Sequence, residues 1–270
     1  VEVIVPPKSF LNASEDVPHG QASFTGRVCV QALHLAGSKM TFDSDFREVT
    51  SAPFSATLLQ YNFGGYDQYG MPVAGVPSSI NAQGQGARCD MDGEHTMGFF
   101  WAPEVDCLSA EECEAKFPWL YLSRNLLDTN LHGYGKYRGG VGMTDIFTLH
   151  NVPTMLKSSI GHGSIFPLNY GLFGGYAGPT TPRFVIRGSD LKKKMAETQD
   201  LPYGLWEVAN SGKINGRYCF ERGQWSAAEF HGDDVFVMQN GSGGGYGDVL
   251  ERDPDLVLQD VQDHLITREV

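Results

Sequence analysis

The sequence predicts an α+β chain, in which β-rich mixed sheets joined by glycine-rich loops are flanked by a buried N-terminal helix and a C-terminal helix. Short apolar runs recur between turn residues, and two longer segments carry apolar side chains at helical spacing. Glycine makes up 33 of the 270 residues, in clusters rather than repeats, which is typical of tight turns and close backbone approaches. No internal repeat or linker divides the chain, so residues 1–270 are treated as a single unit.

The first predicted helix covers residues 21–37 and is apolar on nearly every side. Phe24, Val28 and Leu35 share one face, with further apolar residues beside it. A helix that is apolar nearly all round is expected to be buried. Gly37 is its predicted end.

Capping residues predict three further helices. Ser109 and Glu112 have the spacing of a capping box, Ser189 is a predicted cap, and Asp253 and Pro254 suit an N-cap and a first turn. These helices are expected over residues 106–116, 190–198 and 254–266.

The remaining apolar runs predict strands. They cover residues 1–6, 120–123, 141–149, 154–160, 183–187 and 234–238. Residues 52–61 fit either a helix end or a strand. Residues 64–86 lack a period and predict a long loop, which in a compact protein is usually functional or packed on a partner.

Charge and composition exclude several classes of protein. The formal net charge of −12 argues against sequence-independent nucleic-acid binding, and residues 192–194 are the only basic run. No apolar run is long enough to span a bilayer, and the N-terminus does not resemble a signal peptide, so we expect a cytoplasmic protein. The five cysteines form no CxxC pair, which argues against a structural zinc site and favours free thiols.

The glycine run over residues 241–248 follows a predicted strand. Consecutive glycines there could present backbone N–H groups to an anion. The alternative is a tight turn against which neighbours press closely. The run matches neither a P-loop nor a dinucleotide-binding fingerprint.

Three further loops hold candidate catalytic residues. His162, between Gly161 and Gly163, has an accessible ring suited to proton transfer, and a hydrogen-bonded surface histidine is the alternative. Arg138 could clamp a carboxylate or phosphate, or simply pair with one of the many acids. His95 lies in an acidic cluster.

That acidic cluster has the residue types of a cation site but no known spacing. Asp90, Asp92, Glu94 and His95 match neither an EF-hand nor a zinc-protease motif, and a polar turn is the alternative, so no metal ligand is assigned. No nucleophilic triad is evident. The chain is therefore expected to be one piece of a larger enzyme.

Three motifs together resemble the C-terminal half of the hydantoinase B/5-oxoprolinase family. They are residues 133–142 (GYGKYRGGVG), 171–176 (GLFGGY) and 243–254 (GGGYGDVLERDP). The third is the most specific, and the resemblance covers most of the chain. The loop between His162 and Tyr176 contains Pro167 but no arginine or Pro-Pro pair, which is more similar to acetone- and acetophenone-type ketone carboxylases than to cyclic amide hydrolases.

The resemblance implies an ATP-dependent carboxylation of a ketone with bicarbonate through phosphorylated intermediates. It implies a hydantoinase A-type partner that binds ATP and Mg, a metal-bearing (Mn, Zn or Fe) N-terminal half of the subunit, and a small zinc-binding subunit. This chain would bind no cofactor itself and would help to enclose the cavity, as a separately encoded or processed part. A cyclic amide hydrolase or a purely structural subunit remain the alternatives.

Overall fold

The structure, a computed structural model, describes most of the chain. It covers residues 4–9, 12–14, 16, 23–54, 59–76, 82–97, 108–161, 163–197, 200–221 and 225–269. Within these ranges no helix combines the length and apolar character needed to cross a bilayer.

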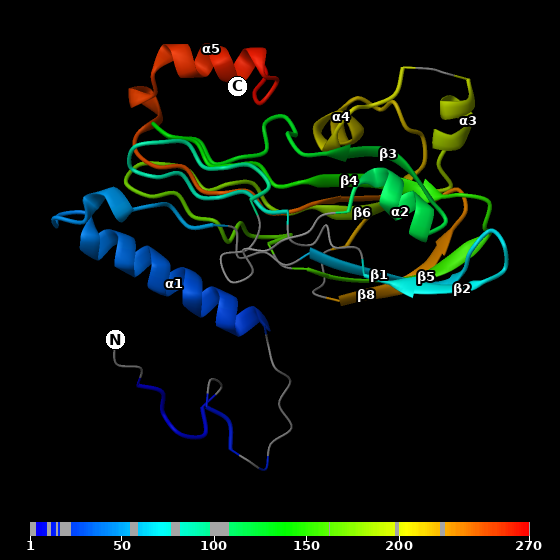
Figure 1. Ribbon diagram of the computed structural model, residues 1–270, viewed down its shortest axis with the longest axis horizontal. Coiled ribbons are helices and arrows are strands. Elements are labelled where there is room, and N and C mark those ends of the chain that lie inside the picture. The colour runs from blue at the N-terminus through cyan, green and yellow to red at the C-terminus, as the bar shows by residue number, and fades with distance from the viewer. Residues whose placement is uncertain are drawn as a thin grey trace.

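Two antiparallel sheets form the body of the molecule (Figure 1). The four-stranded sheet has the order β2 (Pro72–Gly75), β1 (Leu59–Tyr66), β5 (Thr154–Gly161) and β8 (Trp225–His231). The five-stranded sheet has the order β3 (Trp119–Asn125), β4 (Thr144–Leu149), β9 (Val235–Gln239), β6 (Arg183–Arg187) and β7 (Arg217–Phe220). The predicted α+β class is confirmed.

Aromatic side chains fill the space between the two sheets. Tyr61 and Phe63 of β1 face Trp119, Phe147 and Phe236 of the larger sheet, and all five are almost fully buried. The ring centroids of Phe63 and Trp119 lie 5.1 Å apart, and those of Tyr61 and Phe236 lie 5.3 Å apart. Such edge-on and tilted contacts add to the apolar area that aromatic rings bury.

Short helices cover the outer face of the five-stranded sheet. Side chains of α3 (Leu191–Ala196) and α4 (Leu205–Asn210) pack on Ile146, Ile186 and Val237 in a second apolar core. The larger sheet is therefore buried on both faces, which accounts for the complete burial of β4 and β9.

Helix α2 (Ala110–Lys116) confirms the predicted capping box. The Glu112 N–H donates to Ser109 Oγ at 3.2 Å, and the Ser109 N–H donates to Glu112 Oε2 at 3.0 Å. Cys113 of this helix is buried in the aromatic core. It is a free thiol, and so are the half-buried Cys29, Cys89 and Cys219; Cys107 lies outside the described residues.

Four segments beyond the ends of the strands form a layer of extended backbone, which we call the loop layer. It comprises residues 82–97, 130–143, 169–178 and 240–248. These segments lie side by side in Figure 1. Their backbones are joined by hydrogen bonds such as Gly140 N–H to Gln85 O (2.7 Å), Gly243 N–H to Gly140 O (2.8 Å) and Gly245 N–H to Tyr176 O (2.9 Å).

Glycine is required in the loop layer because backbone there contacts backbone. A Cβ atom on Gly243 would lie 1.7 Å from Gln85 O, and one on Gly140 would lie 1.8 Å from Glu94 O. The N–H groups of Gly243, Gly245 and Gly247 all donate to carbonyls of the layer. They are therefore not available to cradle an anion, and the close-contact alternative for the glycine run is correct.

Two helices lie on opposite sides of the loop layer in Figure 1, α5 (Pro254–Gln262) above and α1 (Ser23–Thr41) below. Helix α5 begins as predicted, since Asp253 Oδ1 accepts the Asp255 N–H at 2.9 Å. Two short 3-10 helices, η1 (Arg47–Val49) and η3 (Val249–Glu251), follow α1 and precede α5.

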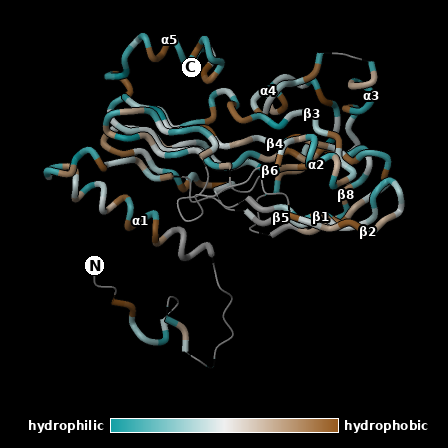
Figure 2. Tube along the Cα trace, viewed as in Figure 1, coloured by the Kyte–Doolittle hydropathy of each residue, from teal (hydrophilic) through white to brown (hydrophobic). Residues whose placement is uncertain are grey.

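The predicted burial of the N-terminal helix is wrong for residues 29–41, and so is its predicted end; the side chains of Phe24 and Val28 lie outside the described part of the structure. Helix α1 continues past Gly37, and Leu33 and Met40 are exposed to solvent. Figure 2 shows hydrophobic residues on this helix although it lies apart from the sheets. The prediction failed because α1 turns a mixed side to the body, which includes Gln31, Ser38 and Leu35, and leaves Leu33 and Met40 on the opposite side.

Other differences lie in short or exposed strands. Residues 4–6 are not a strand, and residues 1–3 lie outside the described part of the chain. The expected loop over residues 64–86 contains the end of β1 and all of β2, and β7 and β8 were not predicted. Strands β2 and β7 have no fully buried side chain, so they lack the continuous apolar run that revealed the central strands.

We predict that Gly243→Ala destabilises the fold severely. The added methyl group would overlap a carbonyl oxygen that is itself held by a backbone hydrogen bond, so we expect a loss of about 3 kcal/mol or more. Urea denaturation of the purified protein measures it. Gly188→Ala is the control, because a Cβ there meets no atom within 4 Å, although its φ of +59° adds some strain. Equal losses in both variants would contradict the close-contact explanation.

Candidate functional site

Two of the three predicted catalytic residues lie close together in the loop layer beneath α5. Arg138 and His95 come from adjacent segments, because the Gly93 N–H donates to Arg138 O at 2.7 Å and the Thr96 N–H to Val141 O at 2.9 Å. His162 lies outside the described residues, between the end of β5 and Gly163. Its role stays a prediction.

A ring of four charged side chains joins α5 to the loop layer. Arg252 donates from Nη1 and Nη2 to the two oxygens of Asp92, at 2.8 Å each, and from Nη2 to Asp260 Oδ2 at 2.6 Å. Arg138 Nε donates to Asp260 Oδ1 at 2.8 Å and lies 3.6 Å from Asp92 Oδ2. The side chains of Arg252 and Asp260 are only 7% and 5% exposed, so the ring is largely shielded from water.

The two arginines keep Asp92 ionised. Burial alone would raise the pKa of this carboxyl, but the hydrogen bond from Arg252 and the positive charges of Arg138 and Arg252 outweigh burial and hold the pKa below its ordinary value. Asp92 is therefore ionised at neutral pH. Partnered charges of this kind fix geometry more than they add stability.

Polar groups without partners face the same region. The Nη1 atom of Arg138 and both ring nitrogens of His132 are buried and have no hydrogen-bond partner within the described ranges. His132 is 2% exposed, and its ring lies 4.7 Å from the ring of Tyr134. The Gly139 N–H donates to Gly133 O at 2.9 Å, which brings His132 and Arg138 to the two ends of one tight loop.

Both histidines of this cluster are neutral at physiological pH. Burial, followed by the charge of Arg138, lowers the pKa of His132 to about 3 and that of His95 to about 4. His95 Nδ1 accepts the Val141 N–H at 3.0 Å, so in the neutral ring the proton is on Nε2. Neutral imidazoles of low pKa are suited to donating a hydrogen bond to developing negative charge rather than to acting as strong bases.

Sequence reasoning missed His132, Arg252 and Asp260. His132 directly precedes the GYGKYRGG motif, and Arg252 lies inside the GDVLERDP motif, so the motifs themselves were the available signal. Asp260 gave no signal, because an acidic residue on a C-terminal helix is ordinarily solvated.

The acidic cluster over residues 90–95 does not converge on one point. Asp90 pairs with Arg88 at 3.5 Å on the surface, while Asp92 turns towards Arg252. Across the described ranges, no three His, Cys, Asp or Glu side chains are arranged to hold a metal ion.

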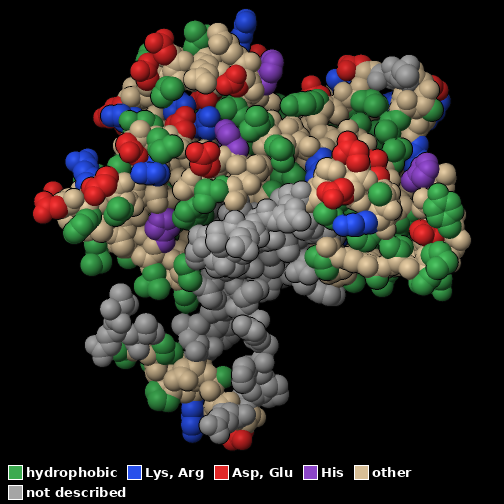
Figure 3. Space-filling model, viewed as in Figure 1, with side chains coloured by type: hydrophobic (Ala, Val, Ile, Leu, Met, Phe, Trp, Pro, Cys, Tyr) green, Lys and Arg blue, Asp and Glu red, His purple; other side chains and the backbone are tan. Residues whose placement is uncertain are grey.

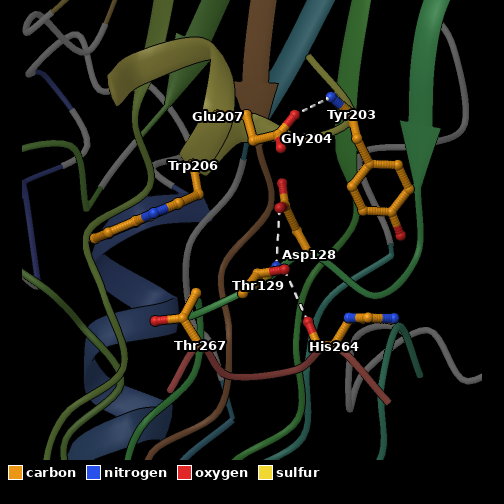
Figure 4. A pocket seen from close by; sticks show the side chains of 8 residues that line it. All are labelled: Asp128, Thr129, Tyr203, Gly204, Trp206, Glu207, His264 and Thr267. Carbon is orange, nitrogen blue, oxygen red and sulfur yellow. Dashed lines mark hydrogen bonds between the residues drawn. The ribbon is translucent and has the colours of Figure 1, made fainter. Parts of the chain in front are cut away.

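A separate pocket of about 410 Å³ lies between residues 128–129, the start of α4 and the residues that follow α5 (Figure 4). Tyr203, Trp206 and His264 contribute its aromatic walls. Asp128 lies at its base. Its Oδ1 accepts the Thr129 N–H (2.9 Å), and its Oδ2 accepts Thr144 Oγ1 and the Leu205 N–H (2.7 Å each). Burial raises the pKa of Asp128 despite these bonds. Asp128 therefore anchors the start of α4.

These features define a two-sheet α+β chain whose glycine-rich loop layer encloses a neutral histidine cluster under a C-terminal helix. Residues 1–249 match the family model described as hydantoinase B/oxoprolinase. The chain belongs to the hydantoinase B/oxoprolinase family.

Its relatives include subunits of ketone carboxylases. The chain is 32% identical, over 89% of its length, to the acetophenone carboxylase delta subunit of Aromatoleum aromaticum, and 28% identical, over 85%, to the acetone carboxylase alpha subunit of Xanthobacter autotrophicus. It covers 35% and 30% of those proteins, so it spans about a third of their length.

Two solved structures share the fold. A nucleotide-free acetone carboxylase matches 88% of this chain with a TM-score of 0.74 and 25% identity, and the chain covers 32% of it. The ATP-dependent caprolactamase from Pseudomonas jessenii matches 85% of this chain with a TM-score of 0.60 and 18% identity, and the chain covers 35% of it. The second likeness shows the fold alone.

We predict that the stability of the fold decreases as the pH falls from about 6.5 towards 4. Both histidines have folded-state pKa values below the unfolded value, so the unfolded chain binds more protons in this window. Each contributes a slope of at most about 1.4 kcal/mol per pH unit, less for the partly exposed His95. Urea denaturation between pH 4.5 and 7.5 measures the slope.

His132→Gln should flatten this pH dependence of stability, because the glutamine side chain does not titrate. The matched control is His231→Gln, at a histidine that is 55% exposed, which should keep the original slope. If His132→Gln retained the full slope, His132 would not be the buried neutral group described above.

Proposed function

We propose that this chain is part of an ATP-dependent ketone carboxylase, which joins a ketone to bicarbonate through phosphorylated intermediates. The observation that carries the proposal is the agreement between sequence and fold: ketone carboxylase subunits match 85–89% of the chain, and acetone carboxylase matches its fold with a TM-score of 0.74. We further propose a ligase-type reaction in the cytoplasm, with the chain inactive alone.

The remaining components would be supplied by partners. In this proposal a hydantoinase A-type subunit binds ATP and Mg, the other part of the hydantoinase B-type subunit holds a divalent metal (Mn, Zn or Fe), and a small zinc-binding subunit completes the assembly. The support for partners is that the chain spans about a third of relatives that are themselves named as subunits.

The chemistry explains why a rigid wall is needed. A ketone is a very weak carbon acid and bicarbonate is a poor electrophile, so ATP would activate them as an enol phosphate and a carboxyphosphate. Both intermediates hydrolyse readily and must be kept from water. The loop layer suits this task, because its backbones pack directly on one another and use their own N–H and C=O groups as partners.

Within that wall, Arg138 and His95 would stabilise negative charge. Asp260 holds Arg138 Nε and leaves its Nη1 unpartnered within the described ranges, and Val141 fixes the ring of His95 with the proton on Nε2. Both groups are preorganised donors, which is the arrangement that stabilises a developing oxyanion. His162, flanked by glycines, would transfer a proton.

We predict that ATP consumption by the purified assembly requires a ketone together with bicarbonate. Phosphate release would be measured with acetone or acetophenone, with bicarbonate, with both, and with hydantoin, 5-oxoproline or caprolactam alone. We expect phosphate release only when the ketone and bicarbonate are both present. Turnover with a cyclic amide alone would contradict the proposal and favour an ATP-dependent cyclic amide hydrolase.

We predict that His95→Asn lowers ketone-dependent turnover while the complex still assembles. The Asn Oδ1 atom can replace Nδ1 as acceptor for the Val141 N–H, but the Nε2 donor is lost, so kcat should fall by about a hundredfold or more. Native mass spectrometry checks assembly, and His231→Gln is the control.

His162→Ala is tested in the same way. If His95→Asn, His162→Ala and the control all retained normal turnover in intact complexes, the catalytic roles would be wrong. The chain would then be a structural subunit.

A further inference from the structure

Helix α1 turns a largely polar side, which also includes the half-buried Leu35, to the body, and an apolar side to solvent. Its polar side chains face the body: Gln31 Nε2 donates to Phe54 O at 2.9 Å, Ser38 Oγ donates to Ser51 O at 2.9 Å, and His34 Nε2 lies 2.9 Å from Ser51 Oγ. Gln31 and Ser38 are buried. Residues three, four and seven apart share one side of a helix, so this polar stripe fixes the inward face.

The outward face is apolar. Leu33, Ala36 and Met40 repeat at spacings of three and four, in line with Cys29 one turn earlier. Leu33 is 57% exposed and Met40 is 80% exposed. Figure 3 shows apolar side chains along the lower-left edge of the molecule, where Figure 1 places α1. Alternating spacings of three and four form the narrow seam with which one helix packs on another element.

Gly37 provides an independent observation. It lies inside a 19-residue helix, where glycine is less favourable than alanine, and a Cβ there would meet no atom within 4 Å. Nothing in the described chain requires a glycine at this position. In a helix, Ala36 and Gly37 next to each other allow another backbone to approach closely, which a lipid surface does not need.

We propose that the outward face of α1, formed by Cys29, Leu33, Ala36, Gly37 and Met40, docks onto the part of a hydantoinase B-type subunit that has no counterpart in these 270 residues. The chain covers only 35% of the acetophenone carboxylase delta subunit and 30% of the acetone carboxylase alpha subunit. About two thirds of such a subunit is therefore polypeptide outside this chain. This proposal rests on family membership and is independent of the ketone chemistry.

Site-specific cross-linking in the native assembly tests the docking. The chain is expressed in its source organism with p-benzoylphenylalanine in place of Leu33 or, separately, of Met40, and cross-linked peptides are identified by mass spectrometry. Tyr69, which is 82% exposed in the turn between β1 and β2, is the control position.

The expected result is that positions 33 and 40 both link to hydantoinase B-type peptides that do not align with this chain. A link to another copy of the chain, a link to a hydantoinase A-type subunit, or no link to protein would each overturn the proposal.

A pair of substitutions on α1 tests the energetic contribution of the face. Leu33→Arg places a charge in the apolar face of α1. It should weaken the binding of this chain to the remaining hydantoinase B-type polypeptide by about tenfold or more, as expected for an apolar anchor. Ala32→Arg is the matched control: Ala32 is exposed on the flank that it shares with Lys39, so it should change association by less than about twofold. Equal effects of the two variants, or no effect of Leu33→Arg, would overturn the proposal.

Discussion

The rest of the structure depends on the direct contact of backbone with backbone in the loop layer. Four segments separated by up to about 160 residues pack so closely that Cβ atoms at Gly243, Gly140 or Gly84 would lie within 2 Å of a carbonyl oxygen. With no side chains between them, the segments satisfy their own N–H and C=O groups, and few alternative arrangements of the same contacts exist. A rigid platform results, on which α5 and the charged ring are positioned.

The platform explains why the charged ring and the histidines have the properties described. The Arg138 N–H donates to Asp92 Oδ1, and the Gly93 N–H donates to Arg138 O, so the backbone of the loop layer positions the two residues that the ring joins to Arg252 and Asp260. The same burial that excludes water from the ring depresses the pKa of His132 and His95, and Arg138 adds to the effect. Burial in the loop layer thus sets both the geometry of the ring and the low pKa values of the histidines. A substitution in the ring is therefore expected to change both.

The sequence predicted those parts of the fold whose signals are local. The capping box of α2, the Asp253-Pro254 start of α5 and the central strands each depend on adjacent residues or on continuous apolar runs. Arg138 and His95 were found as polar residues in loops, but their proximity depends on hydrogen bonds across the layer. His132 could not be recognised, because a histidine becomes buried and unpartnered only through contacts distant in sequence.

The error over α1 has a different origin. An apolar helix was expected to be buried, and burial requires a neighbouring surface. In this chain the neighbouring surface binds Gln31, His34 and Ser38 by hydrogen bonds and contacts Leu35, while Leu33 and Met40 stay exposed. Three features are each unfavourable in an isolated domain. They are the exposed leucine and methionine, the glycine inside a helix, and the buried polar atoms that have no partner within the described ranges. They coexist with a tightly packed loop layer, so the exposed apolar face of α1 is a property of a well-folded chain, and a further polypeptide packed on that face would remove its exposure to water.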